Sequence, residues 1–431
     1  MKLLSSLLVL FLPMYAATQV SFNLKSAIDT TLKNNFDIQI AANNSEISKI
    51  NNTPGVAGAL PLVTGSASDI ESVSNVYQKL NTGDEIRQNN VNGNSLTSSI
   101  NAGMLLYNGS RVWATRERLN LLQQQNELNL NIMIQNSIAA VMAKYYDVVR
   151  QQQYLKIIQY SLDVSQKKLD IITERKNVGM ANDADYLQAL IDVNSALQNL
   201  NSQQLVVDQT KTELLQLMSV RHYYPYTVDD SIVVDKSLQL PAIVSYLQKN
   251  LQYLSAEQEI KINEQIVKEV NALRYPSLRV NAGLSLNSSQ VSAGQTLINQ
   301  NYGPFGGLTL QVPIYNGNAY KVQKEVAVYN LNNARLQQQN LLNDLTADAV
   351  KTYQSYSTTL QQLTSQSNSV DLSGKLISVV MQRFQVNQAT ILDVKAAQAS
   401  YEDTGYQMVN LSYAAKIAEI ELKRLLYQLG N

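Results

Sequence analysis

Apolar positions recur with two different periods along this chain of 431 residues. Near its end they step by threes and fours, at Met408, Leu411, Ala415, Ala418, Leu422, Leu425 and Leu429. This heptad spacing predicts a helix that buries one seam against neighbouring helices in a left-handed coil. Residues 96–106 instead place apolar side chains on even positions and mostly Thr, Ser, Asn and Gly on odd positions. A period of two predicts a β-strand with one apolar and one polar face.

The complete pattern occurs twice in the chain. Ile28, Leu32, Asn35, Ala41, Ile47 and Pro61 match Ile243, Leu247, Asn250, Ala256, Ile262 and Pro276 at a constant separation of 215 residues. Beyond Pro61 the separation is 208 residues, as between Tyr107-Asn108-Gly109 and Tyr315-Asn316-Gly317. A fixed register over nearly the whole chain indicates an internal duplication. We therefore expect two homologous halves, 18–220 and 242–431, joined by a linker over 221–241.

Each half has the same predicted order of elements. The first half is expected to contain a helix over 24–59, strands over about 61–77 and 95–107, a long helix over 110–177 and a helix over 180–218. The second half is expected to contain a helix over 242–274, strands over about 277–287 and 305–315, a long helix over 318–386 and a helix over 388–429. Segments near 81–94 and 288–303, rich in Gly, Asn and Ser, are expected to be loops.

The strands and helices constrain the assembly. In each half the two shorter helices together are little longer than the long one, so they could stack end to end beside it. Four strands with one apolar face and two free edges are not stable alone in water, and four are too few to close a barrel in a membrane. Three copies would supply twelve strands, which lies within the range of outer-membrane barrels. We expect a mainly α fold with a small membrane β part of four strands and six helices per chain.

Aromatic residues lie at or near the ends of the expected strands. They are Tyr77, Tyr107, Trp113, Tyr302, Phe305, Tyr315 and Tyr320. Aromatic belts form where a barrel meets the two membrane surfaces. Ordinary packing at strand ends explains the same residues, and the sequence does not separate the two interpretations.

Composition limits the possible partners and chemistry. The chain has 34 basic and 34 acidic residues and no net charge, so nucleic-acid binding has no electrostatic basis. Cys is absent and His222 is the single His, which excludes thiolate sites and a metal site with two His ligands. No Gly-rich phosphate loop follows a strand. We expect no enzyme activity, no cofactor and no metal. Asn and Gln make up about a fifth of the residues, so the polar surface consists of amides more than charges.

The beginning of the chain has the pattern of an export signal. Lys2 precedes a run of apolar residues to Leu12, and small residues follow at Ala16 and Ala17. We interpret 1–17 as a secretory signal peptide. No later segment approaches 18 consecutive apolar residues, so no transmembrane helix is expected.

The ordered and doubled motifs resemble those of the outer-membrane efflux protein family, the TolC-like factors. The resemblance is carried by Ser21-Phe22-Asn23-Leu24, Leu60-Pro61-Leu62, Leu106-Tyr107-Asn108-Gly109, Tyr275-Pro276-Ser277-Leu278, Pro313-Ile314-Tyr315-Asn316-Gly317, and the segments Arg175 to Asp185 and Arg383 to Asp393. It implies a homotrimer whose 12-stranded β-barrel stands in outer-membrane lipid on a long α-helical barrel that crosses the periplasm of a Gram-negative bacterium. It also implies a passive duct for efflux or type I secretion, with a periplasmic adaptor (membrane-fusion) protein and an inner-membrane RND or ABC transporter as partners.

The resemblance also implies roles for residues at the two helix turns. Asp393 is expected to form an aperture ring and Asp185, its repeat mate, to link neighbouring hairpins, with Phe384 and Gln388 at the same gate. The adaptor is expected to contact the two tips, about Asn177 to Asp185 and Gln385 to Asp393, whose turns are supplied by Val178, Gly179, Val386 and Asn387. The sequence departs from the best-known family pattern, with Phe384 in place of a frequent Tyr, Ala389 in place of a linking Arg and Ala396 in place of a second Asp.

Two alternatives stay open at this stage. Asp185 and Asp393 could simply begin their helices, where a carboxylate interacts favourably with the helix dipole. The whole chain could be an exported coiled-coil structural or adaptor protein without a pore. The second alternative explains the heptads but gives the doubled amphipathic strands no role.

Overall fold

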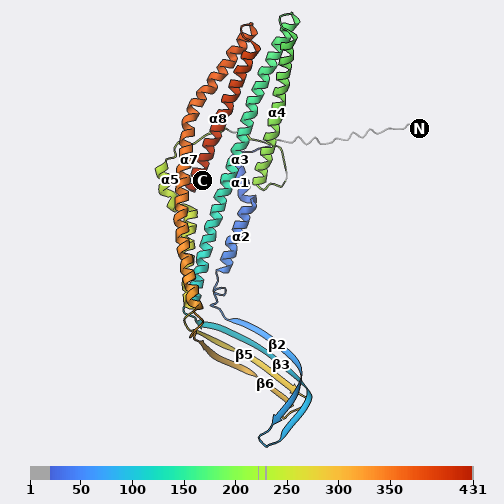
Figure 1. Ribbon diagram of the computed structural model, residues 1–431, viewed down its shortest axis with the longest axis vertical. Helices are drawn as coiled ribbons and strands as arrows, with labels where there is room; N and C mark the ends of the chain where they lie inside the picture. Colours follow the sequence, from blue (N-terminus) through green and yellow to red (C-terminus); the bar gives the residue numbers. More distant parts are fainter. Residues whose placement is uncertain (1–19, 222, 229–230, 430–431) are drawn as a thin grey trace, which may run out of the picture. The chain divides into compact units, whose positions relative to one another are not determined.

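The structure, a computed structural model, describes residues 20–221, 223–228 and 231–429 (Figure 1). The expected signal peptide over 1–17 and His222 lie outside these residues. The chain divides into two compact units. The first contains residues up to Gln39, Ile132–Asn250 and residues from Asp344 onward, and the second contains Ile40–Asn131 and Leu251–Asn343. Each unit takes segments from both sequence halves, so the repeats are not themselves the compact units.

The order of elements is the same in the two halves of the chain. The helices are α1 Leu24–Asn34, α2 Phe36–Asn51, α3 Arg111–Asn177, α4 Asp183–Leu217, α5 Leu240–Tyr246, the short 3-10 helix η1 Leu247–Lys249, α6 Leu251–Ala272, α7 Ala319–Gln385 and α8 Ile391–Leu425. The strands are β1 Val20–Ser21, β2 Leu62–Lys79, β3 Glu85–Tyr107, β4 Tyr226–Thr227, β5 Ser277–Val291 and β6 Ile298–Gln311. The long helices α3 and α7 have 67 residues each, and α4 and α8 have 35 each.

The first helix of each half is broken, which corrects the expectation of single helices over 24–59 and 242–274. The breaks lie at two repeat mates, Asn35 and Asn250, whose backbones are extended at ψ 126° and 138°. The amide of Asn35 donates to the carbonyl of Leu217 at 3.1 Å, and that of Asn250 donates to the carbonyl of Leu425 at 2.9 Å. Leu217 and Leu425 are the last residues of α4 and α8. Each break therefore satisfies a carbonyl that the end of a helix leaves without an intrahelical partner.

The second unit contains a four-stranded antiparallel sheet in the order β2-β3-β5-β6. Its strands are longer than expected. The predicted loops near 81–94 and 288–303 are mostly strand, because pairing continues to Lys79 opposite Glu85 and to Gln290 opposite Ile298. Within the described residues β2 and β6 each pair with one strand only, so both edges of the sheet are open.

The register gives the sheet two different faces. One face carries exposed apolar side chains, namely Ile100, Leu284, Leu286, Tyr302, Leu308 and Leu310. The opposite face carries Thr97, Ser99, Asn101, Asn281 and Thr309, with a hydrogen bond of 3.1 Å from Asn281 to Thr309. Phe305 lies on this polar face, opposite Gly283, where an added Cβ would clash with the Phe305 ring and the Ile100 carbonyl. Of the expected aromatic belt, Tyr302 therefore lies on the apolar face and Phe305 does not.

Helix α3 forms a helical hairpin with α4, and α7 forms one with α8 (Figure 1). The first unit contains α4, α8 and the parts of α3 and α7 that begin at Ile132 and Asp344. Gln203 of α4 donates to the Gln151 carbonyl of α3, and Ser373 of α7 bonds Thr404 of α8 at 2.7 Å. The predicted heptad seam of α8 is buried at its C-terminal end, where Ala415, Ala418, Leu422 and Leu425 are at most 7% exposed. Helix α8 ends at Leu425, short of the expected 429, although Leu429 is still buried.

A short parallel pair, β1 with β4, was not expected from the sequence. It joins the start of the described chain to the linker expected over 221–241. Phe22, next to β1, and Tyr226 in β4 belong to one buried cluster with Tyr145 of α3 and Leu214 of α4. The linker is thus packed on the helices at this point.

The second part of the linker is held by buried charges on α8. Lys416 and Glu419 are 7% and 2% exposed and pair with each other at 3.0 Å. Lys416 also donates to the Val233 carbonyl at 2.8 Å, and the Asp235 backbone N–H donates to Glu419 at 2.9 Å. Lys423 pairs with both Glu419 and Asp235. Charges this deeply buried need partners, and the linker supplies them.

Candidate functional site: the hairpin tips

The turn of the first hairpin follows the rules for ending one helix and starting another. Helix α3 ends at Asn177, and the N–H of Met180 donates to the Arg175 carbonyl at 2.7 Å. Gly179 has a φ of +74°, the left-handed conformation that glycine adopts without strain. Helix α4 then begins after Asn182, whose side chain accepts from the N–H of Asp185 at 2.7 Å.

The turn of the second hairpin repeats this geometry 208 residues later. The N–H of Gln388 donates to the Arg383 carbonyl at 2.8 Å, and Asn387 takes the glycine position with a φ of 63°. Asn is among the few residues besides Gly that adopt this conformation readily. The four residues expected to contact an adaptor, Val178, Gly179, Val386 and Asn387, are all exposed.

The tips carry exposed apolar side chains outside the four turn residues as well. Met180 is 67% exposed and Leu392 is 75% exposed, next to Val178 at 68% and Val386 at 64%. Four large apolar side chains gathered on two short turns are unusual for a surface that meets only water. Met180 and Leu392 lie within the two tip segments, about Asn177 to Asp185 and Gln385 to Asp393, that are expected from the sequence to contact the adaptor.

Asp393 has a defined local role. Together with Thr390 it forms a capping box, in which its carboxylate accepts from the Thr390 N–H and hydroxyl, each at 2.8 Å. These hydrogen bonds, with that of the Thr390 backbone the largest, lower the pKa of the Asp393 carboxyl from its ordinary value. The group is therefore ionised at neutral pH. The geometry supports the interpretation that this carboxylate begins a helix, and it leaves the charge exposed at the tip.

Asp185 and Asp393 line one pocket of about 590 Å³ between the two tips. Phe384 and Gln388 line it as well, so the structure brings all four expected gate residues together. Phe384 forms a buried base at 1% exposure, in one cluster with Ile172 of α3. It belongs to the packing between the hairpins and not to an exposed ring.

Arg175 links the two tips, a role that was not expected from the sequence. Its guanidinium carbon lies 4.6 Å from the centre of the Phe384 ring, and its Nη2 donates to the Phe384 carbonyl. A cation on an aromatic face and a charged hydrogen bond both stabilise such a contact. Tyr is therefore not needed at position 384 for a link between hairpins.

Behind the tips, a buried ion pair of the first hairpin is also reached by an exposed lysine of the second hairpin. Lys168 of α3 is 1% exposed and lies 2.5 Å from Asp192 of α4, and Lys395 of α8 reaches the same carboxylate at 3.4 Å. Burial raises the pKa of Asp192, but hydrogen bonds from Lys168 and Gln188 outweigh it and leave the pKa below its ordinary value. One carboxylate thus connects both hairpins.

Further polar contacts continue the connection between α3 and α8. Ser161 donates to Glu402, and Gln398 donates to the Ser161 carbonyl at 3.2 Å. The rings of Tyr160 and Tyr401 lie 4.8 Å apart. Charged and amide side chains therefore alternate with aromatic ones along this contact between hairpins.

Metal-ligand clusters and membrane-spanning helices are both absent from the described residues. Among residues 20–221, 223–228 and 231–429, no group of three or more His, Cys, Asp or Glu could hold a metal ion. No helix in the described part of the chain is long and apolar enough to cross a membrane.

Comparisons with known proteins agree on one family. The sequence model of the outer membrane efflux protein family matches residues 27–220 and 242–426. Outer membrane protein TolC of Escherichia coli (strain K12) is 21% identical over 358 residues, which cover 80% of this chain and 71% of TolC. The structure of CusC superposes with a TM-score of 0.77 at 17% identity, covering 95% of this chain and 92% of CusC. The CmeC outer membrane channel of Campylobacter jejuni gives a TM-score of 0.78 at 16% identity, covering 94% and 86%.

Proposed function

Since the chain belongs to the outer membrane efflux protein family, we propose that it is the duct of a tripartite efflux or type I secretion system. It lies in the outer membrane with a periplasmic portion. In this proposal three copies form one passive channel, and an inner-membrane RND or ABC transporter supplies the energy. A periplasmic adaptor joins the transporter to the duct.

The observation that carries the proposal is the two-faced sheet with open edges. Its apolar face, with Leu284 57% and Leu308 68% exposed, requires an apolar environment. Its edge strands β2 and β6 have 18 and 14 residues, and in the described residues the backbone groups along the outer side of each strand pair with no other strand. In lipid such edges have to be paired, so β6 of one copy would bond β2 of the next. Three copies of four strands then close a 12-stranded barrel with the polar face inside.

The hairpin tips supply the second part of the proposal. The exposed apolar residues Val178, Met180, Val386 and Leu392 offer an adaptor a contact surface at the periplasmic end. Three copies of Asp393 and of Asp185 around one axis would concentrate negative charge there. Like charges at an aperture attract cations and repel one another, so they favour both cation passage and opening.

Three measurements on the mature protein test the duct. We expect it to stay with membranes in carbonate, to appear as a trimer in native mass spectrometry, and to give ion currents in planar bilayers. Release by salt or carbonate as a monomer would instead support an exported coiled-coil adaptor without a pore. A membrane-bound trimer that carried no current would also contradict the duct.

A further inference from the structure

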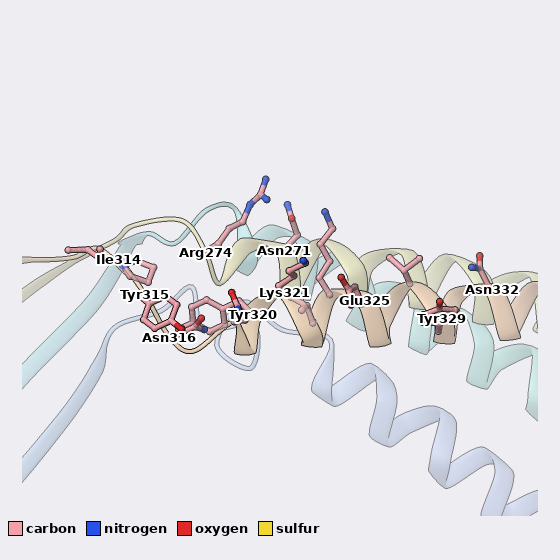
Figure 2. Close-up of a pocket in the computed structure, with 15 residues that line it drawn as sticks. Asn271, Arg274, Ile314, Tyr315, Asn316, Tyr320, Lys321, Glu325, Tyr329 and Asn332 are labelled. Carbon is pink, nitrogen blue, oxygen red and sulfur yellow. The ribbon is translucent and has the colours of Figure 1, made fainter.

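A large pocket lies where the apolar face of the sheet ends and α7 begins. It has a volume of about 950 Å³ and lies entirely within the second unit. The C-terminal end of α6, the segment 313–316 after β6 and the first turns of α7 form its walls. Figure 2 shows Ile314 and Tyr315 at its strand side, Arg274 and Asn271 on the α6 side, and Lys321, Glu325 and Tyr329 along α7.

The pocket borders the apolar face of the sheet. Leu308 and Leu310 occupy even positions of β6 on that face, and Val312 and Ile314 follow at even positions just after the strand ends at Gln311. Val312 is 51% and Ile314 is 93% exposed, and Ile314 lines the pocket. In the proposed channel this level is the boundary between hydrocarbon and water, where lipid headgroups lie.

The pocket carries positive charge without matching negative charge. Arg274, Lys321 and Lys324 line it against one carboxylate, Glu325. None of these four groups forms an ion pair within 4.0 Å in the part of the chain that the structure describes. Arg274 has one hydrogen bond, to the Tyr275 hydroxyl at 3.3 Å.

Two amides of the pocket lack hydrogen-bond partners. Nδ2 of Asn316 and Oδ1 of Asn271 are buried atoms without a partner among the described residues. Buried polar atoms are nearly always hydrogen-bonded in native proteins, so such atoms point to a ligand or water in the pocket. The Asn316 amide is a donor, as are the three cations, and phosphate oxygens accept from all four.

The first half of the chain provides an internal comparison. The repeat mates of Lys321 and Lys324 are Trp113 and Arg116. Trp113 is 78% exposed and uncharged, and Arg116 donates to the side chain of Asn52. The repeated fold therefore does not require two free cations at these positions. The two free cations at these positions occur in the second half alone.

We propose that this pocket binds the phosphate of an anionic phospholipid in the leaflet that faces the periplasm. Lys321, Lys324 and Arg274 pair with the phosphate, and Asn316 donates a hydrogen bond to it. Ile314 and Tyr315 lie against the beginning of the acyl chains. The inference rests on the proposed function, since only a chain that spans the membrane presents this pocket to lipid.

Lipid binding to the full-length protein tests the proposal. Delipidated protein in detergent is titrated with phosphatidylglycerol or phosphatidylcholine and followed by native mass spectrometry. We expect tighter binding of phosphatidylglycerol, and a roughly 30-fold loss of this binding in the double variant Lys321→Gln/Lys324→Gln. Lys351→Gln/Lys375→Gln, with two exposed lysines on the same helix, is the matched control and should bind as the wild type does.

Three results would overturn the proposal. The first is equal binding of the two lipids, and the second is an equal loss of phosphatidylglycerol binding in the control variant. The third is displacement of the lipid by millimolar inorganic phosphate, which would identify a site for free phosphate. Conductance in bilayers of phosphatidylcholine alone separates this inference from the duct. A protein that conducts there without lipid preference overturns only the lipid site, whereas one that neither inserts nor conducts overturns the duct.

Discussion

Asn35 and Asn250 each connect helices through one side chain and its backbone. Asn35 ends α1, accepts from the Ile38 N–H at the start of α2, and donates to the Leu217 carbonyl at the end of α4. Asn250 likewise ends η1 and donates to the Leu425 carbonyl at the end of α8. The Asn35 side chain thus bonds one backbone group at the start of α2 and another at the end of α4.

Replacing either asparagine should weaken the protein. Asn35→Ala and Asn250→Ala each remove a buried hydrogen bond and leave a carbonyl unpaired, at a cost of about 1–3 kcal/mol in the free energy of unfolding. The sites do not share partners, so the double variant should show nearly the sum. Thermal unfolding measures both effects.

Two further variants make this test specific. Asn35→Asp keeps the acceptor for Ile38 but loses the donor to Leu217, so it should be destabilised as well. Asn44→Ala, at an exposed position of α2, should be neutral or slightly stabilising, because Ala favours helix. Equal stability of Asn35→Asp and the wild type would contradict the role of the Asn35 amide as donor to the Leu217 carbonyl.

Asp192 predicts a pH dependence. Its pKa is lowered in the folded protein, so its contribution is fully present above the unfolded pKa, about 3.9, and is lost as the pH falls through the lower folded pKa. At neutral pH Asp192→Asn leaves Lys168 buried without its counter-ion, which should cost about 3 kcal/mol. The difference from the wild type should shrink below about pH 4.

Thermal unfolding of both proteins at pH 7 and in acid measures this difference. Asp163→Asn is the control, because Asp163 pairs with Lys167 on the surface and should matter by less than about 1 kcal/mol. A difference in the free energy of unfolding between Asp192→Asn and the wild type that stayed constant at all pH values would contradict the role of Asp192 as the counter-ion of Lys168.

Some residues could not have been assigned from the sequence. Leu32 and Ile38 continue an apolar pattern across Asn35, and no Pro or Gly marks the break, since the deciding partner Leu217 is distant in the chain. Lys416 and Glu419 look like ordinary surface residues of α8 until the linker covers them. In both cases the missing information is a tertiary contact.

At the scale of elements, the helical hairpins were easier to predict than the strand ends. The ends of α3 and α7, Asn177 and Gln385, agree with the expected ranges because Gly179 and Asn387 mark the turns. The strands continue through polar segments that read as loops, since β2 with β3 and β5 with β6 form long hairpins whose stability comes from backbone pairing. Composition alone does not reveal such pairing.

The contact between Arg175 and Phe384 predicts how firmly the two hairpins hold each other. Arg175→Gln removes the guanidinium from the ring and the carbonyl, which should cost about 2 kcal/mol at this contact. Amide hydrogen exchange at residues 386–388 should then be up to roughly 30-fold faster. In bilayers the variant should open more often if this contact holds the tip closed.

Lys176→Gln is the matched control on the same turn. Lys176 pairs with Asp183 at 2.8 Å, but both side chains are exposed, so the loss should change exchange less than about fivefold. Similar exchange in both variants would show that the Arg175 contact does not join the tips.

At the scale of the whole molecule, the duplication and the sheet were predictable, whereas the compact units were not. The halves were recognised by register in the sequence, but each compact unit combines segments of both halves. The proposed gate would likewise be a property of several chains. One chain shows Asp393 as a helix cap, and only an assembly can make it a ring.

Selectivity measurements address that ring. Asp185→Asn/Asp393→Asn removes the charges, while the amide oxygen at 393 can still accept from Thr390 and keep the cap. The reversal potential in a KCl gradient should move toward zero if the carboxylates line the aperture. Asp403→Asn, an exposed carboxylate of α8, should leave it unchanged. Unchanged selectivity in the double variant would remove both residues from the gate.

The pairing of β3 with β5 also determines when this protein can fold. These central strands of the sheet are separated in the chain by α3, α4, α5 and α6, and the cluster of the first unit joins Phe22 to Leu429. Neither unit can close before almost the whole chain has been exported. Until then β3 and the apolar face are available to pair with other chains, which is a route to aggregation. The strand order thus makes the interval between the emergence of β3 and that of β5 the period in which this protein is most exposed to mispairing.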